Sequence, residues 1–180
     1  PIGALRIGIA HGSITEFGAS GESTNLIPPD RAHSAGLDYL ALGDWHGHLL
    51  VGDRTAYSGT PEADRFGREE PGSCIAVRAR TGEAPVLERV ETGRYRWLGR
   101  LWEIRTMEDG ERAIAGLRTE GHLSDVLLRL KLVGVASLAD RVAIVTMMED
   151  RLAHELRHLE MDATGLMIQP TADDVARIDV

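Results

Sequence analysis

Two short apolar runs, each ending next to a possible metal ligand, constrain the fold of this 180-residue chain most strongly. Residues 4–12 (ALRIGIAHG) end at His11 and a glycine, and residues 37–47 (LDYLALGDWHG) carry an apolar run that stops at a glycine just before Asp44. Short apolar runs bounded in this way are typical of strands buried in a sheet. Residues 29–36 (PDRAHSAG) lie between them and favour a short helix. The sequence therefore predicts an α/β arrangement in which strand ends carry functional side chains.

The middle of the chain alternates strand patterns with turn residues. Residues 54–62 (RTAYSGTPE) predict a strand followed by a turn. Residues 73–80 and 84–92 are alternating runs joined by Thr-Gly-Glu, which predicts a hairpin. Residues 95–104 (YRWLGRLWEI) are a further strand candidate, expected to close the edge of the same sheet. A first domain over residues 1–105 follows from this succession of strands.

The remainder of the chain changes character. Residues 109–120 favour a helix, and residues 137–159 begin with a serine cap and carry apolar side chains at helical spacing. Residues 124–134 and 161–170 have the composition of strands. We therefore predict a small β-α-β module over residues 106–180 and an α/β (α+β) class for the whole chain.

Composition narrows the possible classes of function. The chain is 43% hydrophobic and 27% charged, which suits a globular protein, and no apolar run approaches the roughly 20 residues that span a bilayer. The net charge of -8 argues against a surface built entirely to grip nucleic acid, but it leaves a local basic strip open. The single cysteine, Cys74, fits a reducing compartment, so we expect a cytoplasmic location and no membrane partner.

One literal metalloprotease motif is a poor candidate for a metal site. Residues 154–158 read HELRH, the His-Glu-x-x-His pattern whose two histidines share a helix face and bind zinc. Such a site needs a third ligand, and the following residues supply no histidine. The motif also falls where the predicted helix gives way to a strand. We therefore expect His154 and His158 to be solvated or to stabilise the helix C-terminus.

A better candidate metal site combines His11 with residues 43–46 (GDWH). Both stretches follow the predicted ends of buried strands, where open α/β sheets bind their ligands. Asp44 and His46 are two residues apart, so they point the same way on an extended segment. Histidine and carboxylate together suit divalent manganese, iron or zinc. The structural alternative is that Asp44 caps a turn while both histidines bond to nearby backbone groups.

The segments around these residues resemble a known family. Residues 43–46 resemble the Gly-His-x-His motif of the calcineurin-like metallophosphoesterases, and more narrowly of the SbcD-type DNA-repair exonuclease branch. Residues 57–62 (YSGTPE) and 66–67 (FG) are similar to the Tyr-Pro-Gly-Ser-x-Glu and Phe-Gly-Glu segments of that branch. The resemblance covers roughly residues 4–90, and the later module is similar to the capping domain of the branch in outline. One departure is that Asp44 stands where the motif has its first histidine.

The resemblance also implies where these residues lie in the family fold. The family opens with an Asp-x-His motif that residues 44–46 also fit, but a Gly-Asn-His motif should then follow. The only asparagine of the chain, Asn25, lies upstream. Residues 43–46 therefore correspond to the last metal motif. We expect the C-terminal half of a metallophosphoesterase β-sandwich core followed by a small β-α-β capping module. Such a fragment lacks the N-terminal metal motifs and any identified catalytic residue, and we expect it to be inactive alone.

The implied chemistry is metal-dependent hydrolysis of a phosphodiester. Two divalent cations, expected to be Mn²⁺, clamp the phosphate and generate a hydroxide. By similarity, His46 serves one ion, and His11 and Asp44 serve the other. Arg65 and Arg68 follow the metal loop and are candidates to bind the substrate phosphate.

The implied partners are DNA and an SbcC-like ATPase subunit. Residues 93–105 (GRYRWLGRLWEIR) interleave arginines with aromatic side chains. They form either a strip that contacts DNA or an ordinary strand with solvated arginines. The acidic charge leaves open a phosphoesterase that acts on a nucleotide or another small phosphoester. Asp44 in place of histidine leaves open a non-catalytic interaction module that keeps the fold.

Overall fold

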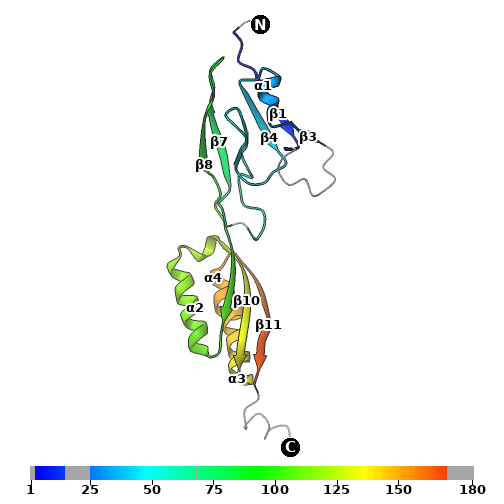
Figure 1. Cartoon of the computed structure of the whole chain (residues 1–180). Helices are drawn as coiled ribbons and strands as arrows, with labels where there is room; N and C mark the ends of the chain where they lie inside the picture. The colour runs from blue at the N-terminus through cyan, green and yellow to red at the C-terminus, as the bar shows by residue number, and fades with distance from the viewer. Residues whose placement is uncertain (1–2, 15–24, 68, 170–180) are drawn as a thin grey trace, which may run out of the picture. The chain divides into compact units, whose positions relative to one another are not determined.

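The computed structural model describes residues 3–14, 25–67 and 69–169, and helices and strands are mixed along them (Figure 1). The predicted α/β class is therefore confirmed. The chain divides into two compact units. Unit 1 consists of Pro1–Asp64 and Glu70–Arg94, and unit 2 of Arg65–Glu69 and Tyr95–Val180.

Unit 1 contains a four-stranded sheet. Its strands, in spatial order, are β1 (Ile7–His11), β4 (Tyr39–Gly43), β6 (Thr55–Tyr57) and β5 (Leu49–Leu50). The first three run parallel, and β5 runs antiparallel to β6. His11 lies opposite Gly43 in the register of the first pair, so both predicted strands end at the same edge of the sheet.

A short helix connects the two strands that carry the candidate site. Helix α1 (Arg31–Ser34) is followed by Gly36, whose positive φ of 63° turns the chain so that the N–H of Leu37 donates to the carbonyl of Ala32 over 2.8 Å. Ala32 of this helix belongs to the same buried cluster as Leu40 and Leu42 of β4. The core of unit 1 consists of Ile14, Ala32, Leu40, Leu42, Val51 and Tyr57.

Among its described residues, unit 1 also contains two smaller strand pairs. Strand β2 (Ser13–Ile14) pairs in parallel with β3 (Leu26–Ile27) directly after β1. Strand β7 (Ser73–Arg78) pairs antiparallel with β8 (Val86–Glu91), which confirms the predicted hairpin.

Unit 2 is a three-stranded parallel sheet with helical connections. The strands are β11 (His158–Ile168), β10 (Val126–Ala136) and β9 (Arg96–Glu103), in that spatial order. Strand β9 is joined to β10 by α2 (Met107–Thr119) and the short η1 (Leu123–Asp125). Strand β10 is joined to β11 by α3 (Leu138–Met147), η2 (Met148–Leu152) and α4 (Ala153–Glu155).

The position of β9 corrects the predicted division of the chain. Residues 95–104 were expected to close the sheet of the first domain, with a boundary after residue 105. Instead β9 pairs in parallel with β10 along its whole length, so unit 2 has a β-α-β-α-β order. The prediction was wrong because an alternating pattern identifies a strand without identifying its neighbour. Strand β9 is followed by helix α2, the crossover that a parallel neighbour requires.

The core of unit 2 follows from strand alternation and helix capping. Leu128, Leu130 and Leu132 of β10 are buried, whereas Arg129 and Lys131 between them are exposed. The helices therefore cover one face of the sheet, and Ile114, Leu117, Ile144, Met148 and Leu152 pack there. Helix α2 begins with a capping box between Thr106 and Asp109. Within the described residues, none of these helices is long and apolar enough to span a bilayer.

Candidate metal centre

The candidate site lies where β1 and β4 end side by side. The N–H of Gly12 donates to the carbonyl of Gly43 over 3.2 Å, which continues the strand pairing by one residue. The buried hydroxyl of Tyr57 donates to the carbonyl of Gly12 over 2.6 Å. Burial raises the pKa of Tyr57, and the nearby carboxylate of Asp44 raises it further, so the phenol keeps the proton that it donates. The backbone beside His11 is therefore held from two sides.

His11 and Asp44 are brought together at this edge. The Nε2 atom of His11 lies 3.6 Å from Oδ1 of Asp44, and the hydroxyl of Ser13 donates to Oδ2 of Asp44 over 2.7 Å. The side chain of His11 is 75% exposed and that of Asp44 is 41% exposed. A separation of 3.6 Å is long for a hydrogen bond. It is close to the roughly 3–3.5 Å that separates two ligands each bound about 2.1 Å from one cation.

Asp44 also has an unusual backbone. Its φ of 105° makes it the sole non-glycine residue with positive φ in the part of the chain that the structure describes. Such a conformation costs on the order of 1–3 kcal/mol and persists where the surrounding structure imposes it. The chain bends at Asp44, directly after β4. The prediction that Asp44 caps a turn and the prediction that it binds metal are both compatible with this geometry.

His46 is directed to a partner that sequence reasoning missed. Its Nδ1 atom contacts the carboxylate of Asp64, and its side chain is 49% exposed. Among the described residues, no three His, Cys, Asp or Glu side chains gather closely enough to hold a metal ion. The structure therefore brings the candidate ligands His11 and Asp44 together and does not add His46 to them. No spacing rule pointed to Asp64, because it lies 18 residues from its partner.

The second segment of the resemblance packs directly on the first. The N–H of Thr60 donates to the carbonyl of His46 over 3.1 Å. Gly59 has a φ of 79°, and a Cβ there would lie 3.0 Å from the carbonyl carbon of Gly47 and 3.1 Å from the nitrogen of His48. Glycine is therefore needed for this close approach. Residues 57–62 thus support the backbone of the loop formed by residues 43–48.

The HELRH segment does not form a metal site. Helix α4 ends at Glu155, Leu156 is extended with ψ 156°, and His158 begins β11, so the two histidines do not share a helix face. Both carboxylate oxygens of Glu155 accept bonds from Arg118. The hydrogen bonds from Arg118 lower the pKa of Glu155, which stays ionised in this pair. The motif therefore joins α4 to α2, and zinc chemistry has no support here.

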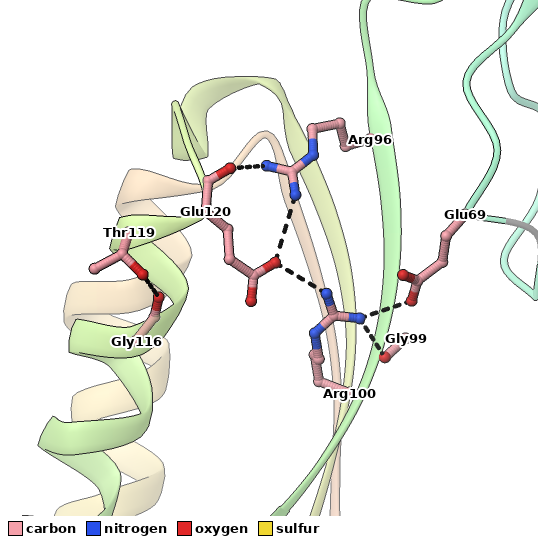
Figure 2. Close-up of polar contacts among 7 residues, drawn as sticks. All are labelled: Glu69, Arg96, Gly99, Arg100, Gly116, Thr119 and Glu120. Carbon is pink, nitrogen blue, oxygen red and sulfur yellow. Dashed lines mark hydrogen bonds and ion pairs between the residues drawn. The ribbon is translucent and has the colours of Figure 1, made fainter.

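The arginines of residues 93–105 are largely engaged with carboxylates. Figure 2 shows Glu120 between Arg96 and Arg100, with its backbone carbonyl 2.8 Å from Nη1 of Arg96 and its carboxylate 2.9 Å from Nη2 of Arg100. Arg100 also reaches Glu69 over 2.7 Å, and Arg105 pairs with Glu103 over 2.7 Å. Partial burial lowers the pKa of Arg100, but its bonds to both carboxylates raise it on balance. These contacts favour the structural alternative over a strip that contacts DNA.

For the remaining predicted residues, a role at the site stays a prediction. Arg65 is an exposed residue of unit 2, whereas the candidate ligands belong to unit 1. Arg68 lies outside the described residues. His48 has a buried Nδ1 without a hydrogen-bond partner among the described residues, and no ligand role follows from that.

Comparison with known proteins assigns no family. No protein-family model matches the chain, and no curated protein matches it.

Proposed function

We propose that this chain belongs to a metal-dependent phosphodiesterase, a DNA-repair exonuclease of the SbcD type. The observation that supports this proposal is the pair His11 and Asp44. Two ligand-type side chains from the ends of adjacent parallel strands meet there, and one of them has a strained backbone. Residues 43–46 and 57–62 also resemble family motifs, and this resemblance implies that the pair binds a metal ion for phosphodiester hydrolysis.

The residues present fit a divalent cation in part. An imidazole nitrogen and a carboxylate oxygen form a mixed donor set, which suits divalent manganese, iron or zinc, and the resemblance implies Mn²⁺. When bound, such ions polarise a phosphoryl oxygen and supply hydroxide at neutral pH. In this chain, Nε2 of His11 and Oδ1 of Asp44 would hold one ion, and His46 would serve the other. The resemblance implies further metal ligands, in the N-terminal motifs of the family, that the sequence of this chain does not contain.

The surrounding residues would keep this pair in place. Ser13 occupies Oδ2 of Asp44, so Oδ1 remains directed at His11. Tyr57 anchors Gly12, the residue after His11. Preorganised ligands of this kind keep their positions when charge develops on the phosphate.

A second candidate function is hydrolysis of a nucleotide or another small phosphoester. The pairing of Arg96, Arg100 and Arg105 with carboxylates favours it, because these side chains are then less available to a DNA backbone. Binding of the intact protein to duplex DNA that weakens steeply with salt would favour the nuclease. The proposal of an SbcC-like ATPase partner rests on the resemblance alone. The proposal of a cytoplasmic location rests on the single cysteine.

Calorimetric titration of Mn²⁺ into the chain tests the proposal. We expect binding by the wild type that His11→Ala and Asp44→Ala each reduce by at least about tenfold. His33→Ala is the matched control, because His33 is also an exposed histidine paired with an aspartate. Equal binding by all four proteins, or the absence of binding by the wild type, would contradict a metal site at His11 and Asp44.

A further inference from the structure

Two of the candidate ligands each have one polar atom occupied by a neighbouring side chain. Asp44 accepts a hydrogen bond from Ser13 at Oδ2, and its other oxygen faces His11. His46 contacts Asp64 through Nδ1, which leaves Nε2 outside that contact. In both cases the partner restricts the orientation of the side chain without using the atom that a metal would need.

The chemistry of the His46 contact determines which nitrogen carries the proton. A neutral imidazole has one N–H and one nitrogen with a free lone pair. An ionised carboxylate only accepts hydrogen bonds, so the nitrogen that faces Asp64 carries the N–H. The lone pair is then on Nε2. Histidines that bind metals commonly donate their other N–H to a carboxylate in this way.

We propose that Asp64 is a positioning residue that holds His46 with Nδ1 protonated and Nε2 available as a metal ligand. This inference rests on the proposed function, in which His46 serves a metal ion. Asp64 lies shortly after residues 57–62, and Thr60 of that segment bonds to the backbone of His46. Thr60 and Asp64 would therefore control the backbone and the side chain of His46, respectively.

The rival interpretation is that Asp64 binds the metal itself. Replacement of Asp64 by asparagine distinguishes a positioning role from a role as metal ligand. The amide carbonyl introduced by Asp64→Asn could still accept the Nδ1–H bond, so a positioning role survives this substitution. A neutral amide is a poor replacement for an anionic ligand, so a direct ligand role does not. Asp64→Ala removes both roles.

The chain offers a matched control elsewhere in unit 1. His33 contacts Asp53 over 2.8 Å, and both side chains are exposed, as in the pair of His46 and Asp64. That contact uses Nε2 of the histidine rather than Nδ1. Asp53→Ala removes a carboxylate of the same kind from an exposed histidine and should leave His46 unchanged.

The experiment uses the full chain with Asp64→Ala, Asp64→Asn and Asp53→Ala. Long-range ¹⁵N–¹H correlation spectra at about pH 8, where an ordinary histidine is neutral, identify the tautomer of His46 without metal. We expect Nδ1–H in the wild type, Asp64→Asn and Asp53→Ala, and a shift toward Nε2–H in Asp64→Ala. Calorimetry with Mn²⁺ should show an affinity about 10–100-fold lower for Asp64→Ala and a much smaller loss for Asp64→Asn.

Each outcome separates this inference from the proposed function. An Nε2–H tautomer in the wild type, or an unchanged tautomer in Asp64→Ala, would overturn the positioning role. Equal loss of Mn²⁺ affinity in Asp64→Asn and Asp64→Ala would overturn it in favour of a direct ligand. A wild type with the expected tautomer but no Mn²⁺ binding would support the contact and contradict the proposed function instead.

Discussion

At the scale of single residues, Asp44 combines a strained backbone with a charged side chain at the end of a buried strand. Its φ of 105° is unfavourable for any residue with a Cβ. One oxygen of its carboxylate accepts a hydrogen bond from Ser13, and the other lies 3.6 Å from Nε2 of His11. The adjacent Gly43 leaves room for the histidine, since a Cβ there would lie 3.1 Å from Nδ1 of His11. The geometry at this corner is therefore set by both residues.

Replacing Asp44 separates strain from ligand chemistry. Asp44→Gly and Asp44→Ala both remove the carboxylate, but glycine alone relieves the positive φ. We expect the glycine variant to have a free energy of unfolding about 1 kcal/mol higher than the alanine variant, while neither binds Mn²⁺ as the wild type does. Urea unfolding and calorimetry measure the two effects. Equal stability of the two variants would show that the backbone is not strained at this position.

At the scale of elements, the parallel pairing of β9 with β10 decides the architecture of unit 2. On the other side of β10, its pairing with β11 shifts register between Lys131 and Val133, and Gly134 follows with a φ of 131°. A Cβ on Gly134 would collide with the carbonyl oxygen of Ile104, the residue directly after β9. Glycine therefore allows β10 to pass close to the end of β9.

Two glycines of this sheet should respond differently to alanine. Gly134→Ala adds a methyl group in a positive-φ conformation against backbone, and we expect it to lower the free energy of unfolding of unit 2 by about 1–3 kcal/mol. Gly99→Ala is the control in β9, because no heavy atom lies within 4 Å of the added Cβ. We expect Gly99→Ala to change stability by less than about 0.5 kcal/mol. Similar losses in both variants, measured by urea unfolding, would contradict the close approach at Gly134.

At the scale of the whole molecule, the two units have separate hydrophobic cores. The core of unit 1 is built around β4 and Tyr57, and that of unit 2 around β10 with α2 and α3. Residues 65–69 belong to unit 2 although residues on both sides of them in sequence belong to unit 1. Phe66 packs edge-on against Trp97 and lies under the guanidinium of Arg129. These two contacts join residues 65–69 to unit 2.

Separate cores predict separate responses to cavity-forming substitutions. Leu42→Ala in β4 and Leu132→Ala in β10 each remove a buried leucine side chain. We expect each to destabilise its own unit by about 2–5 kcal/mol and to leave the other nearly unchanged. Amide hydrogen exchange resolved by residue measures this directly. Loss of protection in both units from either substitution would show that they unfold as one cooperative body.

The sequence alone determined the α/β class, the β7–β8 hairpin, the ends of β1 and β4, and the change from helix to strand within the HELRH segment. These features depend on short-range patterns such as apolar periodicity and turn residues. The pairing of β9 with β10 and the contact of His46 with Asp64 depended on the tertiary structure. Strand partners and side-chain contacts over 18 or more residues are set by how elements pack, and a local pattern carries no information about the neighbour. The meeting of His11 with Asp44 lies between the two cases. The strand ends could be predicted, whereas the positive φ of Asp44 and the 3.6 Å separation of its carboxylate from His11 were decided by the folded chain.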